Sequence, residues 1–171
     1  MHQHYGHINR KGWTGGPWSE EPDKVEFQNP GPCIVIREAN GTLSGYAAVG
    51  RDNPLHGKHL NQTGVFPCFG CTPDKHFGCT PKGAILVYGC LKFAGATQPS
   101  VMLGRGINAV SFDDRDLWWF GFETGINDDF IPSCGLTCSK LMVYRDMNWM
   151  IQKTSNLSAD LAKLGRFSEA A

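Results

Sequence analysis

Two β-type apolar runs in the first third of the chain are separated by turn residues. The runs are "CIVIRE" (33–38) and "TLSGYAAVG" (42–50), and Ala39, Asn40 and Gly41 stand between them. Asn and Gly tolerate a positive φ angle at low cost, which a tight turn between antiparallel strands requires. The pattern therefore predicts a β-hairpin.

Two further runs have the composition of strands. "AILVYGCLKFAG" (84–95) is continuously apolar and predicts a buried central strand with Gly89 at a bulge. "LWWFGFE" (117–123) is rich in aromatic residues and is its expected pairing partner. "GRGINAVSF" (104–112), between them, can supply another short strand. These elements predict a small, mostly antiparallel sheet.

The periodicity changes near the C-terminus, where apolar residues recur at helical spacing. These residues are Met147, Met150, Ile151, Leu157, Leu161 and Leu164. Their spacing predicts one long helix over 144–165, with its apolar face laid on the sheet. Asp146 is a suitable N-cap because its carboxylate can accept backbone N–H groups of the first turn, and Gly165 is a suitable C-terminal cap.

The remaining segments are rich in glycine and proline and predict irregular structure. Residues 1–32 carry several turn signals and are expected to form an extended lead-in, whereas 61–83 are expected to form a cysteine-rich loop. A chain of 171 residues is long enough for one hydrophobic core and fits a single domain over 1–171. The expected fold class is α+β: a small, mostly antiparallel sheet, a Cys-rich loop excursion and one long C-terminal helix.

The adjacent pair Trp118 and Trp119 raises a question about the two faces of its strand. Successive side chains of a strand point to opposite faces, so one core cannot receive both. Trp118 alternates with Phe120 and Phe122, which predicts that it shares the core face with them. Trp119 shares its face with Gly121, where the missing side chain predicts room for a ligand against the indole ring. The structural alternative is a strand covered on both faces.

Charge and hydropathy exclude some partners. The chain has 16 Lys and Arg against 16 Asp and Glu, and the basic residues do not cluster into a stripe that would bind the phosphates of duplex nucleic acid. No apolar run is long enough to cross a bilayer, and the first residues lack the apolar core of a signal peptide. We therefore expect a soluble, cytoplasmic protein without a membrane partner.

The chain has 7 cysteines and no export signal, which favours thiols or metal ligands over disulfides. Four residues in the order C-x2-C-x4-H-x2-C form a candidate structural zinc site: Cys68, Cys71, His76 and Cys79. The last gap is shorter than in a zinc knuckle, so a loop with free thiols is the alternative. Cys134 and Cys138 are alternative ligands, whereas Cys33 and Cys90 lie in predicted strands and are expected to be small core residues.

Six short motifs occur in order along most of the chain. They read "GPWSEEPDKVEF", "GYAAVGRDNPLHGK", "CTPKG", "VYGCLKFAG", "WWFGFETGINDD" and "MVYRDMNWM". Together they resemble a family of small phage, prophage and bacterial proteins with VHGGLTF and WWFGFD-type motifs. The resemblance implies a phage-type protein, and it brings no established activity.

This chain departs from the family pattern at two places. Tyr88 stands where the pattern has His, and the pattern's Asp-Cys-Ala-His is replaced by Glu123, Thr124, Gly125 and Ile126. Histidines with carboxylates are suited to metal binding or acid–base catalysis, since imidazole ionises near neutral pH. The resemblance therefore implies that such a site, where relatives have it, is missing here.

The sequence favours ligand binding over catalysis. It contains no G-x-S-x-G, H-E-x-x-H, phosphate-loop or dinucleotide motif, and no residue is assigned a catalytic role. Aromatic faces stack on nucleobases, so we expect binding of a small planar ligand. The candidate ligand-binding residues are Trp119, Tyr88, Lys92, Phe93 and Arg105. In a phage-type protein the simplest use of such a site is to sequester a nucleotide-type immune signal in the host cytoplasm, as an anti-defence sponge.

Two other function classes remain open. A metal-assisted hydrolase of a nucleotide-type substrate would use His56, His59 and a carboxylate such as Asp113 or Asp128. A zinc-stabilised interaction module would bind a host protein through the cysteine-rich loop. The sequence does not identify the ligand or the host target, and it leaves both a monomer and a homo-oligomer open.

Overall fold

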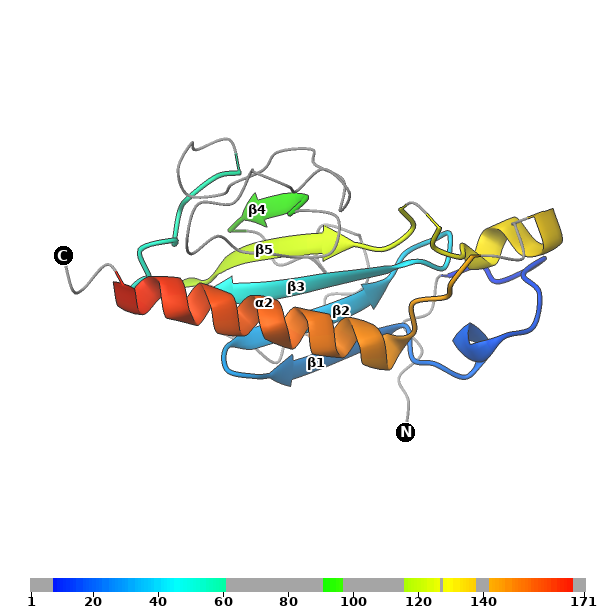
Figure 1. Ribbon diagram of the computed structural model, residues 1–171, viewed down its shortest axis with the longest axis horizontal. Helices are drawn as coiled ribbons and strands as arrows, with labels where there is room; N and C mark the ends of the chain where they lie inside the picture. The colour runs from blue at the N-terminus through cyan, green and yellow to red at the C-terminus, as the bar shows by residue number, and fades with distance from the viewer. Residues whose placement is uncertain (1–7, 61–90, 97–115, 127, 138–141, 168–171) are drawn as a thin grey trace.

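The computed structural model of the protein describes residues 8–60, 91–96, 116–126, 128–137 and 142–167. These residues form a five-stranded antiparallel sheet with one long helix against one face (Figure 1). The strands are β1 (Lys24–Gln28), β2 (Pro32–Arg37), β3 (Leu43–Val49), β4 (Phe93–Gly95) and β5 (Trp118–Glu123), in the spatial order β1-β2-β3-β5-β4. The helices are η1 (Pro17–Ser19), η4 (Pro132–Thr137), both 3-10, and α2 (Met147–Phe167). The α+β class, the antiparallel sheet and the C-terminal helix are confirmed, and the cysteine-rich loop 61–83 lies outside the described residues.

The β2–β3 hairpin forms where the sequence predicts it. Gly41 has a φ of 94°, which glycine adopts without strain. The backbone N–H of Glu38 donates to the carbonyl of Thr42 (2.8 Å), and Asn40 Oδ1 accepts the backbone N–H of Thr42 (3.1 Å). The Asn side chain thus satisfies a backbone group of the turn, which explains why this local sequence specifies it.

β1 lies inside the segment expected to be an extended lead-in, so that expectation is wrong for residues 24–28. β1 pairs antiparallel with β2, and its Val25 and Phe27 pack against the core on the α2 side. The strand is five residues long and has prolines shortly before and after it. Because so short a strand is stable only beside a formed neighbour, β2 determines it more than the local sequence does.

β4 pairs with β5 as predicted, with Phe93 opposite Gly121. In the sheet formed by the described residues β4 is the edge strand and its three residues are half-buried, so its predicted central position stays a prediction. Residues 84–90, including Gly89 at the expected bulge, and the segment 104–112 lie outside the described residues. The rest of that expected strand therefore stays a prediction.

α2 begins directly after Asp146, whose Oδ1 accepts the backbone N–H of Trp149 at 2.7 Å. This hydrogen bond confirms Asp146 as the N-cap. The helix continues to Phe167, so the prediction that Gly165 ends it is wrong. A glycine inside a helix costs about 1 kcal/mol relative to alanine, which the packing of a long helix offsets. In the described part of the chain, no helix combines the length and apolar character needed to cross a membrane.

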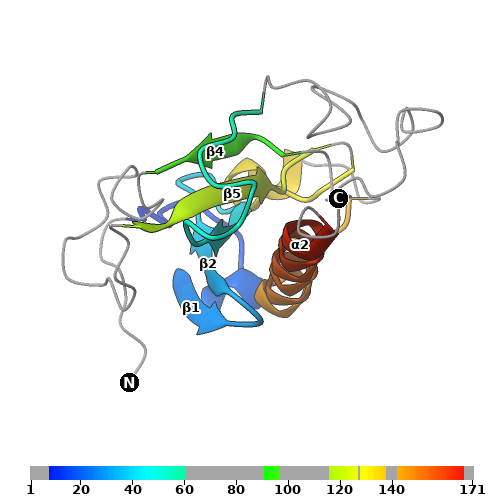
Figure 2. The same ribbon diagram turned by 90° about the vertical axis from the view of Figure 1, so that its left-hand side faces the viewer.

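The sheet carries apolar residues on both faces, and α2 covers one of them, over β2 and β3 (Figure 2). The buried residues of the α2 side include Cys33, Val35, Leu43, Ala47, Val49, Phe120, Phe122, Met147, Met150, Leu157 and Leu161. The other face has Ile34, Ile36, Tyr46, Ala48 and Trp119. Gly45 permits the close approach of α2, because a Cβ at this position would lie 2.2 Å from Thr154 Oγ1. Any side chain here would push the helix away from β3.

Candidate ligand-binding sites

Trp118 lies on the α2 side of β5, where the sequence predicts it. It packs half-buried against the core that contains Phe120 and Phe122. Its indole N–H donates to the carbonyl of Lys58 (2.9 Å), and the rings of His56 and His59 lie 5.9 and 5.0 Å from it, centroid to centroid. Trp118 therefore joins the loop after β3 to the start of β5.

Trp119 lies on the opposite face and has no exposed surface. The room expected beside it is filled: a Cβ on Gly121 would lie 2.3 Å from Cδ1 of Tyr46, so the Tyr46 ring occupies that space. The expectation of free room beside Trp119 is therefore wrong, and both faces of β5 are covered at this pair of residues. A ligand would reach the indole ring only after a rearrangement, and the ligand-binding role of Trp119 stays a prediction.

The other predicted ligand-binding residues are distributed along β4 and beyond it. Phe93 is half-buried and meets Tyr46 edge to face, with 5.9 Å between the ring centroids. Lys92 is exposed, and its backbone N–H donates to the carbonyl of Gly121 (2.8 Å). Tyr88 and Arg105 lie outside the described residues. The structure thus brings Phe93 and Trp119 to the same face of the sheet.

The predicted metal ligands cannot be assembled from the described residues. The zinc set Cys68, Cys71, His76 and Cys79, and the alternative ligand Cys138, lie outside them, whereas Cys134 is exposed. Within the described ranges, no three His, Cys, Asp or Glu side chains gather as a metal site would require.

The residues of the hydrolase hypothesis are not brought together. His56 and His59 contact Trp118 at the start of β5, whereas Asp128 follows the end of that strand. Six residues of strand span roughly 17 Å, which separates the two ends. Asp113 lies outside the described residues.

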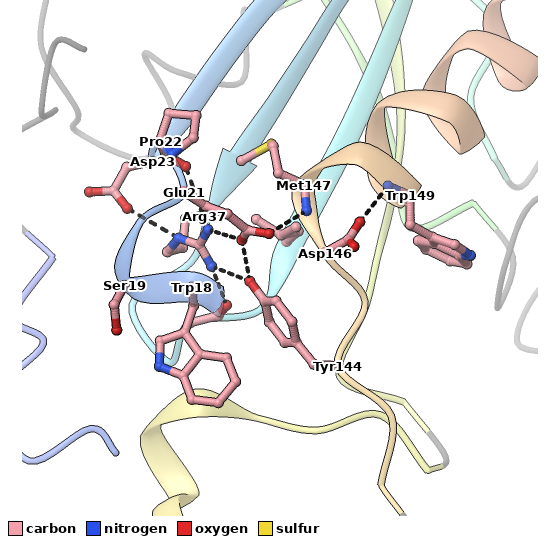
Figure 3. Close-up of polar contacts among 12 residues, drawn as sticks. Trp18, Ser19, Glu21, Pro22, Asp23, Arg37, Tyr144, Asp146, Met147 and Trp149 are labelled. Carbon is pink, nitrogen blue, oxygen red and sulfur yellow. Dashed lines mark hydrogen bonds and ion pairs between the residues drawn. The ribbon is translucent and has the colours of Figure 1, made fainter. Parts of the chain in front are cut away.

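The structure reveals a buried polar cluster around Arg37 that the sequence reasoning did not identify (Figure 3). Arg37 is completely buried on β2. Its Nε donates to Asp23 (3.1 Å), its Nη1 to the carbonyl of Gly41 (3.0 Å) and the hydroxyl of Tyr144 (2.9 Å), and its Nη2 to Glu21 (2.7 Å) and the carbonyl of Pro22 (3.5 Å). These five contacts use all five N–H groups of a guanidinium, so the cluster is a structural centre with no donor left for a ligand.

The charges of the Arg37 cluster balance. Arg37 and Arg10 face the carboxylates of Glu21 and Asp23, and Arg10 also forms an ion pair with Asp23. Burial raises the pKa of Tyr144 well above its usual range, and the hydrogen bond to Glu21 acts in the same direction, so its hydroxyl stays protonated and donates to Glu21. Burial alone would lower the pKa of Arg37, but its contacts with Tyr144 and Glu21 raise it.

Two of the sequence motifs meet at this cluster. "GPWSEEPD" supplies Glu21 and Asp23, and "YRD" supplies Tyr144 and the N-cap Asp146. The Glu21 carboxylate also accepts the backbone N–H of Met147, the first residue of α2 (3.0 Å). The motifs were visible in the sequence, but their spacing of more than 100 residues gave no sign that they touch.

Two hollows are lined by described residues. The Ser158 hollow, of about 340 Å³, is lined by Pro30, Gly31, Pro32, Ala48, Val49, Gly50, Asp52, Asn53, Ser158 and Ala162. The Glu123 hollow, of about 450 Å³, is lined by Glu38, Ala39, Asn40, Thr42, Glu123, Thr124 and Gly125. The second is lined by Glu123, Thr124 and Gly125, three of the residues at which the sequence differs from the motifs that it resembles, and the carboxylates of Glu38 and Glu123 make its lining acidic. Of the predicted ligand-binding residues, the three that the structure describes, Lys92, Phe93 and Trp119, line neither hollow.

Cys33 is buried next to Gly31 and Ser158, two residues that line the Ser158 hollow, which confirms it as a core residue. Burial raises the pKa of its thiol to about 11, while hydrogen bonding from Ser158 and from the backbone of Asn29 acts in the opposite direction. The thiol is therefore protonated at neutral pH, and this cysteine is a poor nucleophile.

The raised pKa of Cys33 predicts a loss of stability at alkaline pH. Above pH ~8.5 the thiol ionises in the unfolded chain, whereas in the folded protein it stays protonated up to about pH 11. The folded state then binds more protons, so the free energy of unfolding falls as the pH rises through this window, by up to ~3 kcal/mol. Urea unfolding of the wild type and of Cys33→Ala at pH 8 to 10.5 measures this fall in the free energy of unfolding. Equal pH slopes for the two proteins would contradict the prediction.

Comparison with protein-family models, with curated proteins and with solved structures finds no match to this chain.

Proposed function

We propose that the protein is a non-enzymatic binding protein for a small planar ligand of the nucleotide type, and that the Ser158 hollow is its binding site. The observation that supports this is a hollow of about 340 Å³ between the β1–β2 turn, the end of β3 and α2. Small-molecule sites are usually concave and have volumes of roughly 300–1,000 Å³.

The walls of the Ser158 hollow are held in place without a ligand. The backbone N–H of Gly31 donates to Ser158 Oγ (3.0 Å), which fixes the β1–β2 turn to α2. Asn53 Nδ2 donates to the carbonyl of Leu161 (3.1 Å), which fixes the loop after β3 to the same helix. A site formed in advance does not have to be ordered when a ligand binds, so more of the contact energy contributes to affinity.

The lining of the Ser158 hollow suits a ligand whose planar ring lies inside the hollow and whose charged group lies outside it. Pro30, Pro32 and Val49 provide rigid or branched apolar walls against which an aromatic ring can lie. Arg51 stands in sequence between Gly50 and Asp52, and its side chain is 72% exposed. Its ion pair with Asp116 (2.7 Å) is also exposed and contributes little, so the guanidinium is able to turn to a ligand phosphate.

The proposed biological use is sequestration of a nucleotide-type signal, in the host cytoplasm if the chain is phage-encoded. The phage-type motifs of the sequence support this setting. A binder that removes a signal needs a site of high affinity and no catalytic group.

The proposal is tested by ligand recovery. The protein is mixed with a panel of mononucleotides and cyclic dinucleotides, separated from free ligand, denatured, and the released compound is identified by mass spectrometry. We expect uptake of at least one nucleotide and its recovery intact. Recovery of a converted compound would show an enzyme, and no uptake of any nucleotide would overturn the proposal.

A matched pair of variants assigns the uptake to the hollow. Ala162→Leu places a larger side chain in the Ser158 hollow, and we expect it to weaken uptake at least 10-fold. Asn156→Leu introduces the same side chain at an exposed position of α2 that does not line the hollow, and should leave uptake unchanged. Equal uptake by both variants would show that the ligand binds elsewhere.

A further inference from the structure

Asp52 gives the Ser158 hollow a single charged side chain. Among the described residues that line it, Asp52 is the one with an ionisable side chain. Its carboxylate folds back over Gly50, since a Cβ at Gly50 would lie 2.8 Å from Asp52 Oδ1. The Asp52 side chain is exposed, but its carboxylate lies close to Gly50, another residue of the lining, and so borders the hollow.

The other polar side chains of the hollow are already engaged. Asn53 donates to the carbonyl of Leu161 and accepts the backbone N–H of Leu55 (2.9 Å). Ser158 Oγ accepts the backbone N–H of Gly31. In the described structure the Asp52 carboxylate has neither a hydrogen-bond donor nor an ion-pair partner, so it is the group that remains for a ligand.

We propose that the Ser158 hollow selects ligands whose inserted end carries paired N–H donors directed at Asp52. A carboxylate has two oxygens and accepts two parallel N–H bonds from one planar group. The N1–H and 2-amino groups of guanine have this geometry, and so does a guanidinium. The guanine case rests on the proposed function, with the base in the hollow and the phosphate near Arg51, whereas the guanidinium case does not.

The same chemistry predicts which nucleotides are rejected. Hypoxanthine has the N1–H of guanine but lacks the 2-amino group, so it makes one hydrogen bond to Asp52 instead of two. A bidentate contact of this kind contributes a discrimination of roughly 10- to 100-fold between related bases. Guanosine monophosphate is therefore expected to bind at least 10-fold more tightly than inosine monophosphate.

The experiment compares three probes on three proteins by isothermal titration calorimetry. The probes are guanosine monophosphate, inosine monophosphate and agmatine, a small guanidinium compound. The proteins are the wild type, Asp52→Asn, and Glu20→Gln as a control, because Glu20 is an exposed carboxylate that does not line the hollow. We expect Asp52→Asn to weaken the binding of guanosine monophosphate at least 10-fold and to remove the preference for it over inosine monophosphate, while Glu20→Gln retains both the affinity and the preference.

The outcomes separate this inference from the proposed function. Equal binding of the two nucleotides, unaffected by Asp52→Asn, would overturn the inference and leave nucleotide binding standing. Asp52-dependent binding of agmatine without binding of any nucleotide in the uptake panel would support the paired-donor inference and overturn the proposed function. Failure of all three probes to bind to the wild type would overturn the inference, whatever else the panel shows.

Discussion

Replacement of Arg37 by methionine is expected to lower the free energy of unfolding by about 3–5 kcal/mol. Arg37 is completely buried, and the carboxylate of Asp23 beside it is 6% exposed. Methionine fills a similar volume but provides no N–H, so two carboxylates lose their main buried cation and the carbonyl of Gly41 loses its donor. Such a loss is a large part of the stability of a domain of this size. Urea unfolding followed by circular dichroism measures it.

The matched control is Arg51→Met. Arg51 also forms an ion pair, with Asp116, but both side chains are more than half exposed. Exposed ion pairs contribute at most about 1 kcal/mol, so this variant should unfold almost like the wild type. Arg37→Lys keeps the charge but cannot make five hydrogen bonds, so we expect its free energy of unfolding to lie between those of Arg37→Met and Arg51→Met. If Arg37→Met were as stable as Arg51→Met, the cluster would not hold the fold together.

The expected effect is large because the Arg37 cluster joins three distant parts of the chain. Asp23 and Glu21 come from the segment before β1, Gly41 from the β2–β3 turn, and Tyr144 from the segment before α2. Glu21 in addition binds the first backbone N–H of α2. Loss of Arg37 therefore affects the position of the helix as well as that of the lead-in.

The parts of the fold that were predicted correctly are those determined by neighbouring residues. The Asn40-Gly41 turn depends on a local φ angle and on a hydrogen bond between residues two positions apart. The N-cap of α2 depends on Asp146 and a backbone N–H three positions on. In both, the side chains that determine the geometry are next to each other in the sequence, so the pattern alone is informative.

The features that were missed depend on distant partners. β1 is a strand because β2 lies beside it, and Gly165 does not end α2 although it has the residue type that often does. The space beside Gly121 looked free in the sequence because the residue that fills it, Tyr46, lies on another strand. The register of β3 and β5, which places Tyr46 opposite Gly121, cannot be read from either strand alone.

The candidate binding site also could not be predicted from the sequence, because its residues come from distant parts of the chain. The residues that the sequence marks as candidates are aromatic residues, cysteines and histidines, because their side chains have distinctive chemistry. The Ser158 hollow is built mainly from proline, glycine, alanine and backbone atoms of three separate segments, and its charged group is one aspartate in a polar loop. No motif marks such a set, so only the fold could bring it together.

Trp119→Ala is expected to lower the free energy of unfolding by about 3–5 kcal/mol, and Trp118→Ala by less than about 2 kcal/mol. Trp119 has no exposed surface and packs with Ile34, Ile36 and Tyr46, so its removal leaves a cavity that these residues cannot fill. Trp118 is half-buried beside two histidines, and solvent can occupy part of the space that it leaves. Denaturant unfolding and melting temperatures of the two variants, measured side by side, test this order.

The two tryptophans control for each other, because they are the same residue at adjacent positions of one strand, on opposite faces. If Trp118→Ala lowered the free energy of unfolding more than Trp119→Ala, the packing on the α2 side of β5 would contribute more to stability than the packing on the other face. If Trp119→Ala kept its stability and lost nucleotide uptake, the indole ring would be part of a binding site that opens for the ligand. The proposal that the nucleotide binds in the Ser158 hollow would then be wrong. We expect instead that any uptake lost by Trp119→Ala follows the fraction of unfolded protein. Uptake measured at a temperature where the variant remains folded should then equal that of the wild type, since Trp119 does not line the hollow.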